Sequence, residues 1–305
     1  MSTYHVRPNP RLDFPKIVYK TDTLLDPTEK HVIAPLPNKP FVWAVVGPSN
    51  SGKTTMMIRL LTGIKRSGLL QTRCYRKIFN TIFLVSPSLH NIKSNPFEEI
   101  MEKEGQYYDE LNDDVMADIF DYCKNPPMID EEGNEFELPP KILIVLDDCI
   151  SELKGSRFIQ DTLSTICANK RHLAGGVSIF FLSQVFNSIP AKVRKNFTHI
   201  SLFRTSSKKE MNTIYDELDL GMEKSEYYKL LRFTFNTPHS FLFTSFEDPD
   251  KILYKRFEKI EKVSSVKTPT KIKTLLDHAT ETPTEEEADK KEKATKEAEK
   301  TDLYT

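Results

Sequence analysis

The segment GPSNSGKT, residues 47–54, constrains the fold of this chain more than any other feature. It directly follows the apolar run 41–46 (FVWAVV), and the amphipathic stretch TMMIRLLTGI comes at once after it. An apolar strand, a glycine-rich turn with the spacing GxxxxGK(S/T) and a helix, in this order, are the context of a phosphate-binding P-loop. The motif and its flanks therefore predict a P-loop fold rather than a chance match in a strand-to-helix turn.

The residue types in this loop suit the binding of a polyphosphate. Gly47 and Gly52 allow a turn in which successive backbone N–H groups point inward, and the following helix adds the positive end of its dipole. Lys53 would reach the β- and γ-phosphates, and the hydroxyl of Thr54 would bind Mg²⁺, as in any P-loop nucleotide hydrolase. We expect the nucleotide to be bound by Gly47, Pro48, Ser49, Asn50, Ser51, Gly52, Lys53, Thr54 and Thr55.

Short apolar runs alternate with helical stretches along the chain. Each run is apolar almost throughout, as in strands that are buried on both faces of a parallel sheet. We expect an α/β fold, with a mainly parallel central sheet flanked by helices and a C-terminal hairpin at 240–260 that turns at Asp248, Pro249 and Asp250. The predicted strands are 41–46, 78–86, 142–146, 177–183 and 199–203. The predicted helices are 53–64, 96–123, 155–168, 190–196, 208–218 and 225–233.

Two adjacent acids end the apolar strand KILIVLDDC, in the form of a Walker B motif. Asp147 would hold Mg²⁺ through a water, and Asp148 would polarise the attacking water, although many such enzymes have Glu there. The alternative is a pair at a helix N-terminus, where Asp is favoured. The strand candidate 78–86 lies between the P-loop and this pair, which favours the RecA-like (ASCE) class, in which a strand is inserted between the two motifs.

Two further polar residues flank the apolar strand 177–183. Gln184 follows it and would hydrogen-bond the γ-phosphate or the attacking water, unless it is an ordinary strand-ending glutamine. Arg171 precedes it, on the rim of the sheet, where the nucleotide of a neighbouring subunit could meet it and its charge could stabilise the transition state. Arg194 and Arg204 are rival candidates for this role, and each of the three could instead be a surface or ion-paired arginine.

Charge and composition exclude several classes of protein. The chain has 43 Lys and Arg against 44 Asp and Glu, a net charge of −1, which argues against a globally basic nucleic-acid coat. It has no apolar run of about 18 residues and no signal peptide, so we expect a soluble intracellular chain without a membrane span. The four cysteines and seven histidines lack zinc-ligand spacing, so we expect reduced thiols and no protein-held zinc.

The order GPSNSGKT, ILIVLDD, NKRH and SIFFLSQ resembles that of the FtsK and HerA-type ATPases, and within them the poxvirus-type genome-packaging ATPases of large double-stranded DNA viruses. The resemblance covers roughly residues 41–204. It implies a motor that forms a ring, hydrolyses ATP with Mg²⁺ and pumps double-stranded DNA of any sequence into preformed capsids, in the host-cell cytoplasm. It implies capsid or portal proteins as further partners and association with the virion. The roles that it implies are catalytic for Lys53, Asp148, Gln184 and Arg171, and metal-binding for Thr54 and Asp147.

The flanks of the predicted ATPase domain, residues 39–263, differ from it in composition. Residues 1–38 are rich in Pro and polar groups, which suits an extended arm, and residues 264–305 are charged with few apolar side chains, which is typical of a disordered tail. Within the domain, three basic clusters could contact DNA phosphates or could be plain solvated faces. They comprise Lys65, Arg66, Arg73, Arg76 and Lys77, then Lys192, Arg194 and Lys195, and finally Lys208 and Lys209.

Two other classes of function stay open. A small-molecule or nucleoside kinase would need an Arg-rich lid over its acceptor, and the Ser-Gln end of strand 177–183 argues against it. A non-hydrolysing P-loop switch or scaffold is the second, and the intact Lys53, Thr54 and Asp147 argue against it. DNA-stimulated turnover separates the packaging motor from both.

Overall fold

The computed structural model describes most of the chain between Val32 and Ile260, all within the compact unit Met1–Ile260. The described residues are 32, 34–62, 64–67, 70–87, 105–129, 133, 135, 137–247 and 251–260. The predicted tail at 264–305, most of the predicted arm at 1–38 and the predicted turn at 248–250 lie outside these residues.

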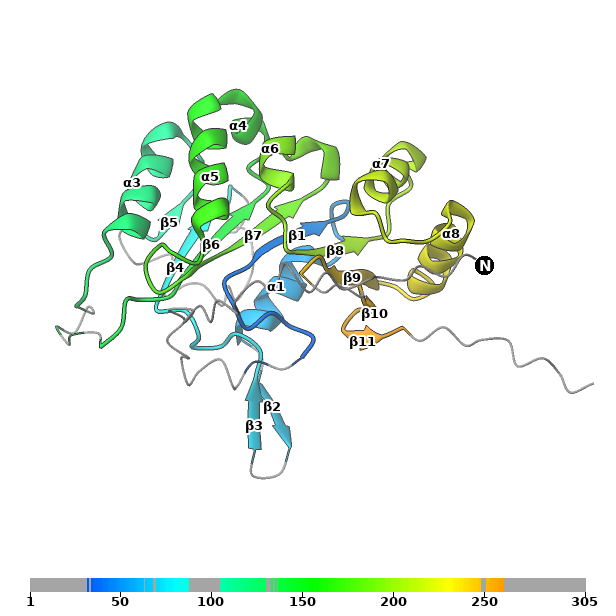
Figure 1. The fold of residues 1–305 in the computed structure, drawn as a ribbon, viewed down its shortest axis with the longest axis horizontal. Helices are drawn as coiled ribbons and strands as arrows, with labels where there is room; N and C mark the ends of the chain where they lie inside the picture. The colour runs from blue at the N-terminus through cyan, green and yellow to red at the C-terminus, as the bar shows by residue number, and fades with distance from the viewer. Residues whose placement is uncertain are drawn as a thin grey trace, which may run out of the picture. The chain divides into compact units, whose positions relative to one another are not determined.

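In the described part of the chain, nine strands form one sheet in the order β11-β10-β9-β8-β1-β7-β6-β4-β5 (Figure 1). The strands from β8 to β5 in this order run parallel, and β9, β10 and β11 continue the sheet in antiparallel pairs. The predicted mainly parallel sheet with a C-terminal hairpin is therefore confirmed. The bounds are β1 Val42–Val46, β4 Thr81–Val85, β5 Tyr107–Tyr108, β6 Ile142–Asp147, β7 Val177–Ser183, β8 His199–Phe203, β9 Phe241–Ser245, β10 Leu253–Lys255 and β11 Glu258–Lys259.

The inserted strand of the RecA-like order is β7, which pairs with β1 on one side and with β6 on the other. The sequence interpretation took the candidate 78–86 as the inserted strand, and this was wrong. Its structured part, β4, pairs with the opposite side of β6. The order of strands along the sequence differs from their order in the sheet, because a crossover connection can place the next strand beyond an existing neighbour.

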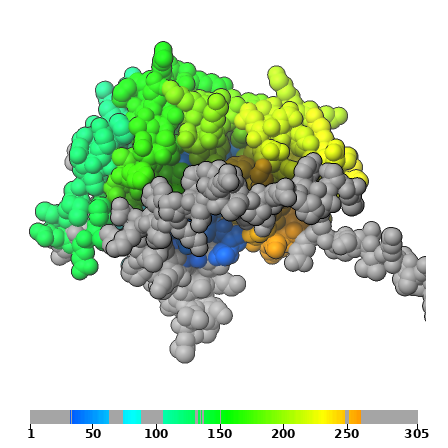
Figure 2. Space-filling model, viewed as in Figure 1, coloured from blue at the N-terminus to red at the C-terminus, as the bar shows by residue number. Residues whose placement is uncertain are grey.

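Helices cover both faces of this sheet (Figure 1). One apolar cluster joins the strands to α3, α5, α7 and α8, and a second joins them to α1 on the opposite face. In the space-filling view, α3, α5, α7 and α8 form the surface over their face of the sheet (Figure 2). The bounds are α1 Lys53–Thr62, α3 Asp113–Lys124, α4 Ile150–Gly155, α5 Arg157–Asn169, α6 Ala191–Arg194, α7 Lys208–Leu218 and α8 Lys224–Thr234. None of the described helices is long and apolar enough to cross a membrane.

Local capping sets where two of the predicted helices begin. Residues 96–104 of the predicted helix 96–123 lie outside the described residues, and Tyr107–Tyr108 form β5. The described helix α3 begins at Asp113, since the side chain of Asn112 accepts a hydrogen bond from the backbone N–H of Val115 (2.9 Å) and starts the helix there. The predicted helix 155–168 is α5, which begins at Arg157 because Ser156 caps it, and the short helix α4 that ends at Gly155 was not predicted. The hairpin of β2 (Ile64–Ser67) and β3 (Leu70–Arg73) was not predicted, and α1 ends before it.

The two faces of β1 show why its sequence is apolar throughout. Val42, Ala44 and Val46 pack toward the α3 and α5 side, while Trp43 and Val45 pack toward α1. This is the alternation that a strand buried on both faces requires. The one polar group of Trp43 is satisfied, since its ring N–H donates to the hydroxyl of Ser201 (3.0 Å).

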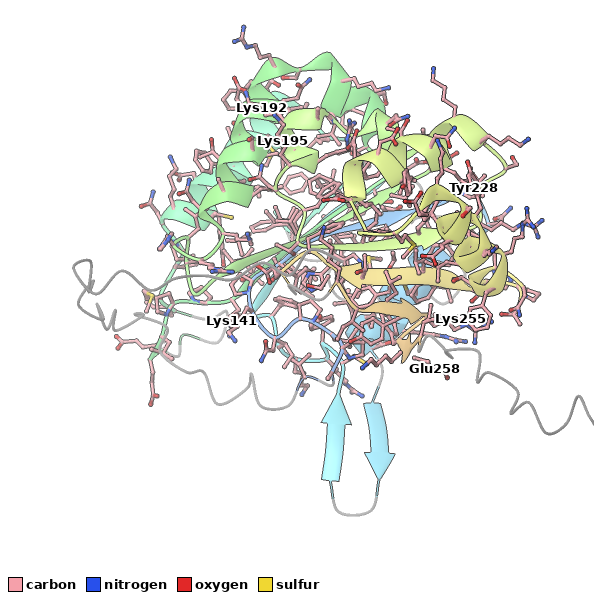
Figure 3. All side chains as sticks on the ribbon, turned by 45° about the vertical axis from the view of Figure 1, so that its right-hand side comes forward. Lys141, Lys192, Lys195, Tyr228, Lys255 and Glu258 are labelled. Atoms are coloured by element: carbon pink, nitrogen blue, oxygen red, sulfur yellow. The ribbon has the colours of Figure 1, made fainter. Side chains whose placement is uncertain are left out.

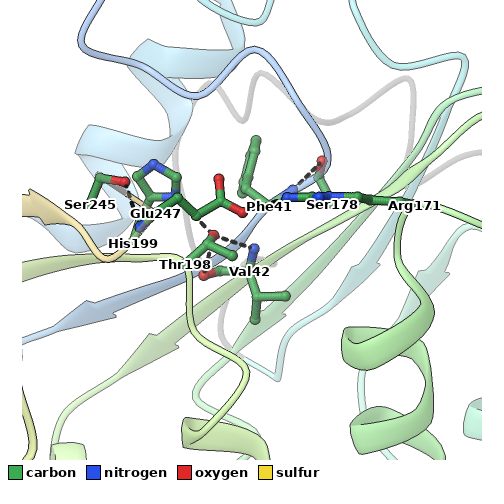
Figure 4. Close-up of polar contacts among 8 residues, drawn as sticks. All are labelled: Phe41, Val42, Arg171, Ser178, Thr198, His199, Ser245 and Glu247. Atoms are coloured by element: carbon green, nitrogen blue, oxygen red, sulfur yellow. Dashed lines mark hydrogen bonds and ion pairs between the residues drawn. The ribbon is translucent and has the colours of Figure 1, made fainter. Parts of the chain in front are cut away.

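A buried histidine makes the stability of this core depend on pH. His199 in β8 is 3% exposed, shares a hydrogen bond with the hydroxyl of Thr198 (2.8 Å, Figure 4), and stacks on Phe243. Burial, with a smaller contribution from the charge of Lys170, lowers the pKa of His199 from 6.5 to about 3. The folded protein therefore holds this ring neutral in a pH range where the unfolded chain protonates it.

We predict that the free energy of unfolding falls as the pH drops below 6.5, by about 2 kcal/mol from this residue at pH 5. Denaturant unfolding at pH 7.5 and pH 5 measures it, and His199→Phe should lose less stability between the two than the unaltered protein. The exposed His172, changed to Gln, is the matched control and should leave the pH dependence unaltered. Equal pH dependence of the His199→Phe variant and the unaltered protein would contradict the assignment.

Candidate functional site

The register of the parallel strands brings the predicted site residues to one edge of the sheet. Val46 at the end of β1 is level with Ser183 on β7 and with Leu202 on β8, and Asp147 on β6 is level with Leu182. The loops that follow these strands therefore emerge side by side at the carboxyl edge. In open α/β sheets this edge is where ligands bind.

The P-loop runs from the end of β1 to the start of α1 at Lys53. Gly47 has no room for a side chain, because a Cβ atom there would lie 2.5 Å from Cβ of Phe203 and 2.9 Å from Oγ of Ser51. Gly52 has φ +104°, a conformation that other residues rarely adopt. Each glycine that the motif specifies is thus required by a different local constraint.

Lys53 extends across the mouth of the loop. Its ammonium group donates to the carbonyl oxygens of Gly47 (2.8 Å) and Pro48 (3.1 Å). Burial lowers the pKa of this ammonium, while the nearby charges of Asp147 and Asp148 oppose the shift. A partly desolvated cation at the N-terminus of α1, beside the glycine-rich loop, is suited to attract a polyphosphate.

Asp147 ends β6 with only 4% of its surface exposed. Its Oδ2 atom accepts from the hydroxyls of Thr54 and Ser86, both at 3.5 Å. Burial and then the charge of Asp148 raise the pKa of this carboxyl to about 6, against the opposing effects of Lys53 and the two hydroxyls. Ser86 was not proposed for the site, although it ends the predicted strand 78–86, and a polar residue at the carboxyl end of a parallel strand is the signal that could have found it.

Asp148 and Gln184 contact each other directly. The amide Nε2 of Gln184 donates to Oδ2 of Asp148 at 2.8 Å. Asp148 has φ +61°, in the left-handed region, while its backbone N–H donates to the carbonyl of Leu182 (3.1 Å). The next residue after β6 and the next after β7 thus place their side chains together at the site, where the sequence analysis expected both to act.

The oxygen donors of the site fit Mg²⁺. Thr54 offers a hydroxyl and Asp147 a carboxylate, the hard oxygen ligands that this ion prefers. No group of three or more metal-binding side chains occurs among the described residues, and Mg²⁺ commonly completes its shell with waters and substrate phosphates. In addition, the buried Oγ of Ser51 has no hydrogen-bond partner within the described chain, so the loop has a polar group that a phosphate oxygen could satisfy.

A cavity of about 870 Å³ adjoins the P-loop on the α1 side. Lys53, Arg59 and Arg256 line it, none of the described lining residues is acidic, and Phe203, Phe241 and Phe257 supply aromatic walls. His239 enters it next to the carbonyl oxygen of Ser51, 3.1 Å from its Nδ1. Its size and mixed lining are in the range of small-molecule sites. His239 and Arg256 were not found from the sequence, since neither belongs to a local pattern.

The three candidate arginines lie in different surroundings. Arg171 follows α5 and precedes β7, so it lies at the amino edge of the sheet, away from its own P-loop, and pairs with Glu247 at 2.9 Å (Figure 4). Arg194 is held within the chain by two hydrogen bonds to Glu217 (2.9 and 2.7 Å). Arg204 is exposed and directly follows β8, at the P-loop edge.

A sequence profile of the family described as Poxvirus A32 protein matches residues 29–237 of this chain. A comparison with curated protein sequences found no match. Among solved structures, B204, the DNA-packaging ATPase from Sulfolobus turreted icosahedral virus, is similar with a TM-score of 0.49 at 14% identity over 74% of this chain and 100% of that chain. B204 from Sulfolobus turreted icosahedral virus 2 in complex with ATP-gammaS is similar with a TM-score of 0.45 at 16% identity, over 72% of this chain and 98% of that chain. The cytoplasmic domain of the Type VII secretion ATPase EccC from Thermomonospora curvata is similar with a TM-score of 0.44 at 13% identity, over 73% of this chain and 24% of that chain.

The structural likenesses are distant, and the family assignment depends on the sequence match. The matched residues make up more than half of the chain and include the P-loop, both acids, Arg171 and Gln184. The chain therefore belongs to the family of the poxvirus A32 protein.

Proposed function

We propose that this member of the poxvirus A32 family is an ATP-driven motor that moves double-stranded DNA of any sequence into preformed viral capsids. It would act as a ring oligomer in the cytoplasm of the host cell, hydrolysing ATP with Mg²⁺. The observation that carries the proposal is the hydrogen bond between Gln184 and Asp148 beside the P-loop. A loop for phosphates, a buried acid for a metal and a second acid oriented by an amide together make up a hydrolytic site.

Each residue has a separate task in this reaction. The backbone N–H groups of the loop and Lys53 bind the phosphates, and Thr54 and Asp147 would hold Mg²⁺, which neutralises phosphate charge when bound. Gln184 occupies one carboxylate oxygen of Asp148, so the other oxygen is left to accept a proton from the attacking water. The amide fixes the orientation of the base, and the base activates the nucleophile.

The cavity beside α1 suits the nucleoside part of ATP. It is continuous with Gly52, Lys53 and Thr54, which all line it, and its aromatic walls offer stacking surfaces for a base. Arg59 and Arg256 make it cationic, which favours an anionic ligand over a neutral one.

We predict that purified protein hydrolyses ATP faster with double-stranded DNA than without it. Lys53→Ala should abolish turnover by weakening nucleotide binding. Asp148→Asn should lower kcat by roughly 100-fold or more at unchanged nucleotide affinity, since an amide cannot accept the proton. Steady-state hydrolysis and binding of a fluorescent ATP analogue measure the two effects.

The exposed Asp114 on α3, changed to Asn, is the matched control and should hydrolyse ATP normally. Wild-type nucleotide affinity in Lys53→Ala would contradict the role of the loop. Turnover that ignores DNA would favour the kinase or switch alternatives over a motor.

Arg171 is predicted to act on the nucleotide of a neighbouring copy, because it lies at the amino edge of its own sheet. Arg171→Ala should lose most DNA-stimulated turnover, and mixing it with Lys53→Ala subunits, which keep the arginine, should restore part of the rate. The exposed ion pair with Glu247 contributes little to stability, so the variant should stay folded. Arg157→Ala, another exposed arginine, is the control. Full activity of Arg171→Ala alone would exclude this arginine and shift the role to Arg204.

The three basic clusters differ in how many of their charged side chains form ion pairs within the described chain. In the cluster on and just after α6, Lys192 is ion-paired with Asp161 and Arg194 with Glu217, whereas Lys195 forms no ion pair among the described residues. Lys192 and Lys195 are labelled in Figure 3. In the first cluster, Lys65, Arg66 and Arg73 belong to the β2–β3 hairpin, whose side chains are not described. Lys208 and Lys209 are exposed in the first turn of α7 and form no ion pair within the described chain.

Lys208 and Lys209 stand where a helix disfavours cations, since the N-terminus is the positive end of its dipole. An anionic partner would relieve this repulsion, and DNA phosphate is such a partner. We predict that Lys208→Ala/Lys209→Ala weakens DNA stimulation of the ATPase and makes the log–log salt dependence of DNA binding shallower by about 2. Lys229→Ala/Arg232→Ala, two exposed cations on α8, is the control of equal charge. Unchanged DNA affinity and salt dependence would exclude this cluster.

A further inference from the structure

Of the acidic residues that the structure describes, two are buried. One is Asp147 in the proposed site, and the other is Glu210 in the first turn of α7, with 5% of its surface exposed. A carboxylate removed from water destabilises a protein strongly unless hydrogen bonds compensate it. The partners of Glu210 therefore show which parts of the chain its burial holds together.

Each carboxylate oxygen of Glu210 binds a different loop. Oε1 accepts from the backbone N–H of Phe186 at 2.7 Å, and Oε2 accepts from the hydroxyl of Thr205 at 3.0 Å. The backbone N–H of Glu210 in turn donates to Oγ of Ser207, the cap of α7, at 3.2 Å. Both carboxylate oxygens thus accept hydrogen bonds from within the chain, and the side chain is buried away from solvent.

The two loops lie on opposite sides of the P-loop strand. Phe186 is two residues beyond Gln184, in the loop after β7, and Thr205 is one residue beyond Arg204, in the loop after β8. Both β7 and β8 pair with β1. A single side chain therefore ties the segment that orients Asp148 to the segment that begins α7.

We propose that Glu210 is a positioning residue that couples the Gln184–Asp148 pair to α7. This rests on the proposed ATPase function and adds a route by which the nucleotide reaches the helix that carries Lys208 and Lys209. A shift of Gln184 moves the backbone at Phe186, and the carboxylate passes this movement to Thr205 and the first turn of α7. In the reverse direction, a ligand on α7 changes how firmly Gln184 holds Asp148.

The kinetic test is a double-mutant cycle. Glu210→Ala should lower kcat by about tenfold with KM for ATP unchanged and should remove DNA stimulation, since the base is bound but poorly oriented. In a Gln184→Ala background the same change should have little further effect, because coupled residues are not additive. Glu210→Gln should recover most of the rate, since its amide can still accept from Phe186 and can donate to the Thr205 hydroxyl.

The matched control is Glu217→Ala, which removes an acid from the same helix and loosens its contact with Arg194. It should leave kcat and DNA stimulation unchanged. If Glu210→Ala and Gln184→Ala lower kcat independently, or if Glu210→Ala keeps its DNA stimulation, the coupling is excluded. If Glu210→Ala does not fold, Glu210→Gln is compared with the unaltered protein instead. Loss of DNA stimulation in Glu210→Gln with kcat intact would also overturn the proposed coupling.

Hydrogen exchange tests the coupling without any turnover. In the unaltered protein, a non-hydrolysable ATP analogue should slow hydrogen exchange both at the Phe186 amide and in the first turn of α7. In Glu210→Ala, the slowing should be confined to the loop around Gln184 and should not reach α7. A first turn of α7 that ignores nucleotide in the unaltered protein would overturn the proposal. A protein that binds the analogue and shows this response but never hydrolyses ATP would refute the proposed function and leave the coupling standing.

Discussion

The pairing of β1 between β7 and β8 is the constraint on which the site depends. It sets Gly47 against Phe203 so closely that no side chain fits, and the backbone N–H of Gly47 donates to the carbonyl of Ser183 at 3.0 Å. A slip of one residue in either pairing would turn the apolar faces of β1 over and move the loop away from Asp147. The P-loop is thus held by the two strands that flank β1, and its conformation does not rely on the loop residues alone.

This placement also creates the electrostatic character of the site. Two adjacent carboxylates and one ammonium lie at the edge of a dry core, where burial raises the pKa of Asp147 to about 6 and lowers that of Lys53. The charges of Lys53 and Asp147 offset each other's pKa shifts only in part, and the charge of Asp148 adds to the rise at Asp147. A bound cation would therefore favour the ionised form of Asp147, and a bound polyphosphate would favour the charged form of Lys53. Each ligand improves the site for the other, which is the behaviour expected of a pocket for a metal–nucleotide pair.

Sequence patterns predicted the parts of this molecule that are decided locally. The apolar strands 177–183 and 199–203 and the helix 208–218 have the predicted bounds, because continuous apolar runs and a Ser207 cap define them. The P-loop, the acid pair and Gln184 were found because each follows such a strand. Ser86 was missed although it ends the predicted strand 78–86. Glu210 and His239 were missed, since their roles come from contacts between segments far apart in the chain. The RecA-like order was expected, but the place of strand 78–86 within it was missed for the same reason, as it is set by packing across crossovers.

The two edges of the sheet carry different parts of the proposed reaction. The P-loop, Asp148 and Gln184 stand at the carboxyl edge, whereas Arg171 stands at the amino edge, separated from them by the seven residues of β7, a length of about 20 Å. An arginine side chain cannot cover that length within its own chain, so the proposed role of Arg171 requires a second copy whose carboxyl edge meets the amino edge of the first. Such a contact uses two different surfaces and leaves one of each free, so it repeats, and it gives a closed ring where the rotation between copies closes and an open filament where it does not. The proposed ring is the closed case of this contact, and it needs no self-complementary patch.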